Sequence, residues 1–244
     1  MRWLCFLLVS PAFAQTRTVK PLRFDYTAFP ITRDSFGYVV NREPRGFAVW
    51  QYAQRDSVQQ VVYTQISELQ PIEEEETRVV FDAGTGEPVS STYHLDMFSP
   101  NSDTIVVEHD LKITQGDVVG RRRARTKDGK VHDDSVHHPF PPGTVWLQYA
   151  LYAAAVTNAL PGDSLECPAY SEATDALTIL TFVAGQPTTI KVPAGQFDVL
   201  PLRSGGFRLY VTRAAPRRVV RGETLDRRFS FELVSSKPVV LSEP

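Results

Sequence analysis

The 244-residue chain has the composition of an ordinary folded domain, with 42% hydrophobic and 22% charged residues. This balance excludes a chain that is disordered throughout, and the length suffices for one large β domain or two small ones without disulfide bonds. The formal charge of −2 at pH 7 gives no reason to expect a polyanion, so nucleic acid is not an expected partner.

Residues 1–14 have the pattern of a secretory signal peptide. Arg2 supplies the positive start, residues 4–9 form a short apolar core, and Ala12-Phe13-Ala14 is a small-x-small cleavage site. A first β-strand or an N-terminal helix is the alternative interpretation. Cys5 does not lie in a lipobox, so we expect cleavage after Ala14 and a periplasmic or secreted protein without a lipid anchor. Later apolar stretches are too short to predict a transmembrane segment.

Residues 15–45 are interrupted by three prolines and are predicted to be an irregular N-terminal segment. Residues 46–240 are predicted to form a single β-rich domain. Runs rich in Val, Thr, Tyr and Phe alternate with polar residues there and are bounded by turn residues, which is typical of an antiparallel meander. The expected strands are 46–52, 58–66, 77–81, 89–97, 104–114, 177–183, 188–192, 197–203, 207–213, 217–223 and 229–234.

One segment breaks this rhythm and predicts a helix from about Val145 to Val156. Thr144 can cap its start, and the Pro-Gly pair at 161–162 prevents its continuation. The segment is apolar on nearly every side, and such a helix must be enclosed. We therefore expect a mainly β fold in which a single strongly curved antiparallel sheet, an open or half-barrel, encloses one apolar helix. Its aromatic residues (Trp146, Tyr149, Tyr152) would line or fill the concavity.

The string Val192-Pro193-Ala194-Gly195-Gln196-Phe197-Asp198 resembles the V-P-A-G-x-F hairpin of the domain of unknown function 3108, a family of uncharacterised exported bacterial proteins. The residues at 209–212 and 216–223 resemble the closing strands of that family. The similarity extends from about Val58 to Val234. It implies a curved antiparallel sheet around a helix, akin to the periplasmic lipoprotein-localisation carriers, and it brings no catalytic residues.

The turn Asp82-Ala83-Gly84-Thr85-Gly86 is similar to the active-site loop of aspartic proteases, in which an Asp shares a proton with a second Asp. Here Ala83 replaces the required hydroxyl residue, and the sequence has no second matching loop. A hairpin turn uses the same residue types for conformational reasons. We therefore expect a turn and assign no catalytic residue.

The segment His132 to His138 holds three of the five histidines. On a strand, His132, Asp134 and His138 would share one face, and His with carboxylate suits zinc. However, residues six positions apart on a strand are about 20 Å apart, too far to share one ion. Polar loop residues before a proline-rich turn are the other interpretation. We expect no metal ligand and no cofactor.

Cys167 is the single cysteine of the mature chain, and its apolar neighbours predict a buried, inert thiol. The leading hypothesis is an exported, non-enzymatic envelope protein that binds an apolar small molecule or serves as an interaction scaffold for another envelope protein. A side-chain-filled concavity would favour the scaffold, and a persisting gap the ligand carrier. The alternative is a secreted metal-dependent hydrolase that uses the His132–His138 segment.

Overall fold

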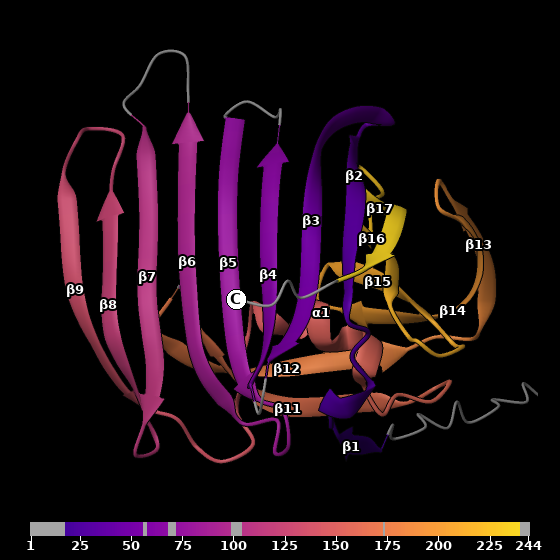
Figure 1. Cartoon of the computed structure of the whole chain (residues 1–244), viewed down its shortest axis with the longest axis horizontal. Coiled ribbons are helices and arrows are strands. Elements are labelled where there is room, and N and C mark those ends of the chain that lie inside the picture. The colour runs from indigo at the N-terminus through magenta and orange to yellow at the C-terminus, as the bar shows by residue number, and fades with distance from the viewer. Residues whose placement is uncertain (1–17, 56–57, 68–71, 99–103, 173, 240–244) are drawn as a thin grey trace, which may run out of the picture.

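The computed structural model describes residues 18–55, 58–67, 72–98, 104–172 and 174–239, with only the backbone described for residues 55–67. The predicted signal peptide and Cys5 lie outside the described residues. The described part is mainly β, as the sequence predicts (Figure 1). Within it, no helix has the length and apolar character needed to cross a membrane.

The N-terminal half forms a series of long antiparallel strands that stand side by side in Figure 1. The short elements β1 (Val19–Pro21) and η1 (Tyr26–Ala28), the second a 3₁₀ helix, come first. The strands that follow are β2 (Thr32–Val40), β3 (Glu43–Arg55), β4 (Val58–Ser67), β5 (Ile72–Asp82), β6 (Pro88–Phe98), β7 (Ile105–Thr114), β8 (Asp117–Arg125) and β9 (Val131–Pro139).

The C-terminal half begins with a short segment that contains the helix, here called the helical crossing, and continues into seven described strands. The crossing consists of β10 (Val145–Trp146), α1 (Tyr149–Ala153) and the 3₁₀ helix η2 (Ala154–Val156). The strands after it are β11 (Ser164–Ser171), β12 (Ala176–Ala184), β13 (Thr188–Val192), β14 (Gly195–Ser204), β15 (Phe207–Thr212), β16 (Val219–Thr224) and β17 (Phe229–Pro238).

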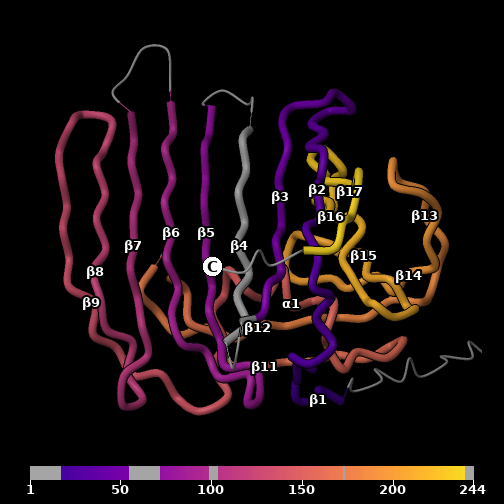
Figure 2. The backbone as a smooth tube through the Cα atoms, in the orientation of Figure 1, coloured from indigo at the N-terminus to yellow at the C-terminus, as the bar shows by residue number. Residues whose placement is uncertain are grey.

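All 17 described strands belong to one hydrogen-bonded order that runs from β1 through β10–β17 and then through β2 to β9. The two halves of the chain meet where β17 pairs with β2. The sheet is open and is neither closed into a barrel nor strongly curled. The prediction of a mainly β fold with an open sheet is therefore confirmed, and the prediction of strong curvature is wrong. The helix is covered for a different reason: Tyr149 and Tyr152 of α1 pack against Phe81 and Trp50 of the long strands, behind which β11 and β12 also cross (Figures 1 and 2).

The prediction of an irregular segment at 15–45 is wrong for the residues described. Those residues include β1, which pairs with β11, and β2, which lies between β17 and β3. The prolines do not prevent this arrangement, because Pro21 ends β1 and Pro44 lies beside a register shift at the β2–β3 hairpin. Between them, Asp34, Phe36 and Tyr38 alternate inward along β2 and are all buried.

The predicted helix is enclosed, but it is shorter than expected. Val145 and Trp146 pair in parallel with β11, so the chain there is extended and α1 begins at Tyr149. Trp146 is fully buried beside the ring of Tyr170. The helix has no side-chain cap, and Thr144 does not act as one. Packing between two layers therefore maintains a helix too short to be stable alone.

Besides β1 and β2, four further strands were not predicted: β8, β9, β10 and β11. The arginines at 121–123 and 125 of β8 and the polar residues of β9 lack the apolar alternation that marks a strand. The hairpin predicted at Val192–Asp198 is present. It joins β13 to β14, with Gly195 at φ 141° and Phe197 packed against the core.

Along the long strands, the residues on the inner face change from buried to solvent-exposed. The cross-strand row Val79, Ser91, Leu111, Gly120, Val136 is mostly buried. Two positions further along lies the row Thr77, Tyr93, His109, Arg122, Asp134, and then the row Glu75, Leu95, Val107, Ala124, His132, in which exposure increases. The candidate site lies at the point on the inner face where α1 no longer covers the strands.

Candidate functional site

An apolar groove of about 270 Å³ lies between α1 and the inner face of the sheet. It is lined by Tyr38 from β2, Trp50 from β3, Glu75 and Thr77 from β5, Phe207 from β15, Phe229 and Phe231 from β17, and Gln148, Leu151 and Tyr152 at the helix. Its volume is close to the lower end of the range of small-molecule pockets. The concave side of this fold is therefore not filled by its own side chains.

Six aromatic rings form the walls of this groove and support one another. The Trp50 ring lies edge-on to Tyr152, with ring centroids 4.9 Å apart, and 5.2 Å from the ring of Phe231. Tyr38 lies 5.3 Å from Phe229, and Phe207 stacks at 6.0 Å on Phe231. Such ring pairs are rigid and stabilise each other beyond the area that they bury. The groove is thus a preformed surface.

Glu75 is the one acidic side chain that lines the groove. The alternation of β5 turns it to the inner face together with Thr77 and Val79, whereas Glu74 and Glu76 are exposed on the other face. The pKa of the Glu75 carboxyl is raised to about 7, mainly by burial; the hydrogen bond from the Tyr93 hydroxyl opposes this shift, and the charge of Glu73 adds to it. Near pH 7 this carboxyl therefore exchanges readily between its neutral and charged forms.

The rings on β15 and β17 depend on Gly222 of the strand between them. A Cβ atom at this position would lie 2.3 Å from the Phe231 ring and 2.8 Å from the Phe207 ring. Both distances are shorter than any real contact, so a larger residue would displace these rings. The shape of the groove is therefore set partly by a residue that does not line it.

A buried polar cluster lies close to the helix start and combines serine, histidine and carboxylate. Ser91 Oγ lies 3.2 Å from His109 Nε2, and Ser91 also hydrogen-bonds to the carboxyl of Glu172, which accepts from the backbone N–H of Gln148 at 3.3 Å. Burial is the main cause that lowers the pKa of His109 to about 4 and raises that of Glu172 to about 7.

This cluster has the residue types of a hydrolase but not the arrangement. In a catalytic triad the acid orients the histidine, whereas here Glu172 contacts the serine. Ser91 is fully buried, so its hydroxyl is closed to a substrate. The cluster instead links β6, β7 and the start of the helix through buried polar contacts.

The Asp82 turn is a structural turn, as expected. Asp82 Oδ1 accepts hydrogen bonds from the backbone N–H groups of Gly84 at 2.9 Å and Thr85 at 2.7 Å, and from the Thr85 hydroxyl at 3.1 Å. These bonds lower the pKa of Asp82. The carboxylate closes its own loop and has the opposite environment to a protease dyad.

The structure places His132, Asp134 and His138 on one face of β9 but does not bring them together. The backbone over Val131–Pro139 is a regular strand, so the first and last of them are about 20 Å apart. Asp134 lies opposite Arg122, and His138 packs near the Tyr170 ring. Among the described residues, no group of three His, Cys, Asp or Glu side chains is placed to hold a metal ion.

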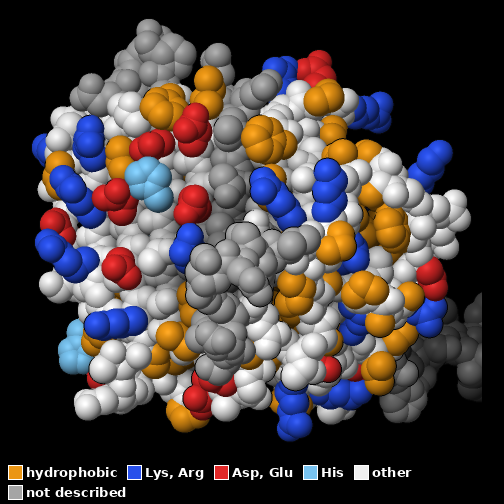
Figure 3. All heavy atoms as spheres, in the orientation of Figure 1, with side chains coloured by type: hydrophobic (Ala, Val, Ile, Leu, Met, Phe, Trp, Pro, Cys, Tyr) orange, Lys and Arg blue, Asp and Glu red, His pale blue; other side chains and the backbone are white. Residues whose placement is uncertain are grey.

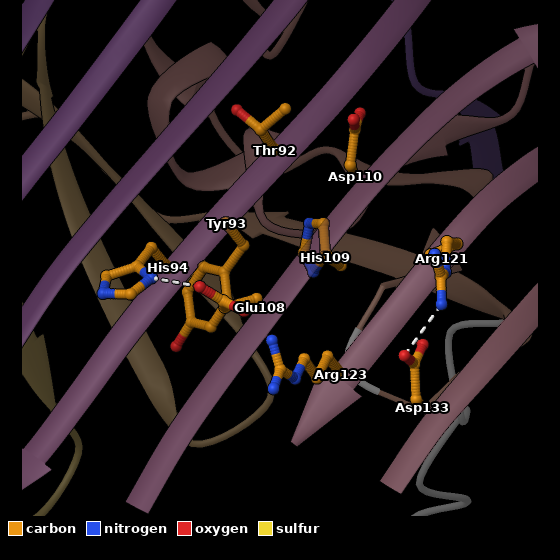
Figure 4. A pocket seen from close by; sticks show the side chains of 9 residues that line it. All are labelled: Thr92, Tyr93, His94, Glu108, His109, Asp110, Arg121, Arg123 and Asp133. Atoms are coloured by element: carbon orange, nitrogen blue, oxygen red, sulfur yellow. Dashed lines mark hydrogen bonds and ion pairs between the residues drawn. The ribbon is translucent and has the colours of Figure 1, made fainter. Parts of the chain in front are cut away.

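A shallow hollow of about 410 Å³ lies on the outer face of β6 to β9 and is charged (Figure 4). Ion pairs cross it from strand to strand, with His94 Nδ1 3.1 Å from Glu108 and Arg121 2.8 Å from Asp133. Figure 3 shows acidic and basic side chains intermixed over these strands. Charges of both signs lie side by side across the strands, as expected for a solvated sheet face.

Cys167 is buried, and burial raises the pKa of its thiol to about 11. The predicted burial of this cysteine is confirmed, and a thiolate is expected to be scarce at neutral pH. The groove, in contrast, was predicted only as a concavity beside the helix. Only Tyr152 of its rings was expected there; the other five come from four strands, and Glu75 lies within an acidic run. The inward position of Glu75 could have been predicted from strand alternation, because every second side chain of a strand points to the same face.

These features define an open, mainly β protein with an aromatic groove beneath one short helix. The chain is similar in structure to a beta-barrel-like protein of the domain of unknown function DUF1849 from Brucella abortus, known from a crystal structure, with a TM-score of 0.53 and 12% sequence identity. The match covers 87% of this chain and 99% of that one, and it shows a shared fold. No family model and no curated protein sequence matches the chain.

Proposed function

We propose that this chain is a non-enzymatic carrier that binds a small apolar molecule in the groove beneath α1. The observation that carries the proposal is the groove itself: about 270 Å³ remains open between rigid aromatic walls. A scaffold that only presents its surface does not need an apolar groove, whereas a carrier of apolar molecules does. The retained gap therefore favours the carrier over the interaction scaffold.

The proposal includes an exported protein that acts in the periplasm or outside the cell. The signal-peptide pattern at residues 1–14 supports export, and the hairpin at Val192–Asp198 supports a relationship to the domain of unknown function 3108. The fold shared with the beta-barrel-like Brucella protein is consistent with an open sheet that leaves the groove accessible.

The metal-dependent hydrolase is the weaker candidate. Its proposed ligands on β9 are spread along a strand, and the buried Ser91 is closed to substrate. Neither arrangement places a reacting group beside the aromatic groove. The aromatic groove, in contrast, already has the shape and polarity of a binding site.

Binding can be tested with the neutral apolar dye N-phenyl-1-naphthylamine, whose fluorescence increases in a dry site. We expect saturable binding to the mature protein. Leu151→Gln should weaken it about tenfold, because a polar group would replace an apolar one at the wall. Leu151 is 37% exposed, so the fold should tolerate the change. Leu177→Gln on β12, at 40% exposed and outside the groove, is the matched control. Equal binding by both variants, or no saturable binding, would reject the carrier.

A further inference from the structure

The groove has one feature that a purely apolar ligand leaves unexplained, which is the carboxyl of Glu75 between aromatic rings. Burying an ionised carboxylate without a partner is unfavourable. The titratable groups that face Glu75 are Glu73 from its own strand, Tyr93 from β6 and Tyr152 from α1. Among the described residues, none of the groups that shift its pKa is a cation. Within the described part of the chain, an ionised Glu75 thus has a hydrogen-bond donor in Tyr93 but no matching positive charge.

The walls around this carboxyl add to its preference for positive charge. The faces of Trp, Tyr and Phe rings carry negative potential and attract a cation within about 6 Å of the ring centre. The six rings of the groove come from both of its sides, and neighbouring rings lie 4.9 to 6.5 Å apart. Packed at these distances, the rings form a continuous aromatic surface, and such a surface beside a carboxylate suits an alkylated ammonium group.

We propose that the ligand of the groove is an organic cation, an ammonium group joined to an apolar body, whose charge lies beside Glu75. This inference rests on the proposed carrier function and names the chemical class of its ligand. An anionic amphiphile such as a fatty acid is disfavoured, because Glu75 and Glu73 would repel its carboxylate. A neutral hydrocarbon would fill the groove but would leave the carboxylate unpaired.

The test compares two molecules of nearly the same shape, phenyltrimethylammonium and tert-butylbenzene, as competitors of N-phenyl-1-naphthylamine. At pH 8.5, where Glu75 is ionised, the cation should bind at least tenfold more tightly than its neutral counterpart. Glu75→Gln should reduce the affinity for the cation to about that for the neutral molecule. The matched control is Glu74→Gln, one residue away on the exposed face of β5, and it should change neither affinity.

Acidification provides a second readout. Lowering the pH from 8.5 to 5.5 protonates Glu75, so the wild-type protein should lose tenfold or more in affinity for the cation and none for tert-butylbenzene. The Glu75→Gln variant should show neither change. If the dye binds but the cation has no advantage, or Glu75→Gln retains that advantage, the organic-cation proposal is wrong while the carrier stands. If the dye does not bind, the carrier fails as well.

Discussion

Glu172 allows the physical account of the interior to be tested through stability alone. Its carboxyl is 1% exposed, and burial raises its pKa from 4.5 to about 7 in the folded chain. The folded protein therefore retains this proton at pH values where the unfolded chain has lost it. The stability that this group contributes is fully present below pH 4.5 and is lost as the pH rises to about 7. Glu172→Gln keeps the shape of the side chain and removes the charge.

The expected size follows from the same pKa values. At 1.36 kcal/mol per pH unit, the interval from 4.5 to about 7 corresponds to about 3 kcal/mol. About 2.5 kcal/mol of this falls between pH 5 and pH 8. Urea denaturation at these two pH values should show Glu172→Gln gaining that amount over the wild type, whereas Glu87→Gln, at an exposed position, should gain little. A difference that is equal at both pH values would refute a neutral, buried Glu172.

Four further outcomes are expected. Trp146→Ala should lower the free energy of unfolding by about 3–5 kcal/mol in denaturant titration, because the indole is fully buried; a loss below about 1 kcal/mol would contradict that packing. N-terminal sequencing of the envelope fraction should begin after Ala14, and an intact Met1 would argue against export. Iodoacetamide at pH 8 should modify Cys167 only in the unfolded protein, since its thiol is buried with a pKa of about 11, and rapid labelling of the native protein would show an accessible thiol. Elemental analysis should find no stoichiometric zinc; one zinc per chain that is lost in His132→Ala would revive the metalloenzyme.

The sequence predicts this fold well where local pattern and burial agree. Alternating apolar residues mark most strands correctly, and the all-round apolar segment correctly indicates an enclosed helix. Strand β9 was missed because its pairing with β8, rather than its composition, makes it extended. The helix start was misplaced for a similar reason. Val145 and Trp146 have a helical context, but their backbone pairs with β11.

The groove could not be predicted from local sequence patterns, because its position depends on how much of the sheet the helix covers. The long strands have 9 to 13 residues, and α1 has only 5. A strand rises about 3.3 Å per residue and a helix about 1.5 Å, so α1 can cover only part of the inner face. The sequence pattern of a strand or of the helix, taken alone, does not show how much of the sheet the helix leaves uncovered.

The same difference in length explains why a carboxyl lies at the edge of an aromatic surface. Where α1 and the crossing strands cover the sheet, inward positions are aliphatic and dry, as at Val79 and Leu111. Four residues further along β5, the inward position is Glu75, beyond full cover but still beside the rings. A longer helix would bury this carboxyl completely, and a shorter one would leave it in water with an ordinary pKa. The intermediate position leaves it partly desolvated and open to a ligand. Under the proposed function, a cationic ligand would supply the positive charge beside Glu75, so the limited cover of the sheet by α1 would help to determine which ligand binds.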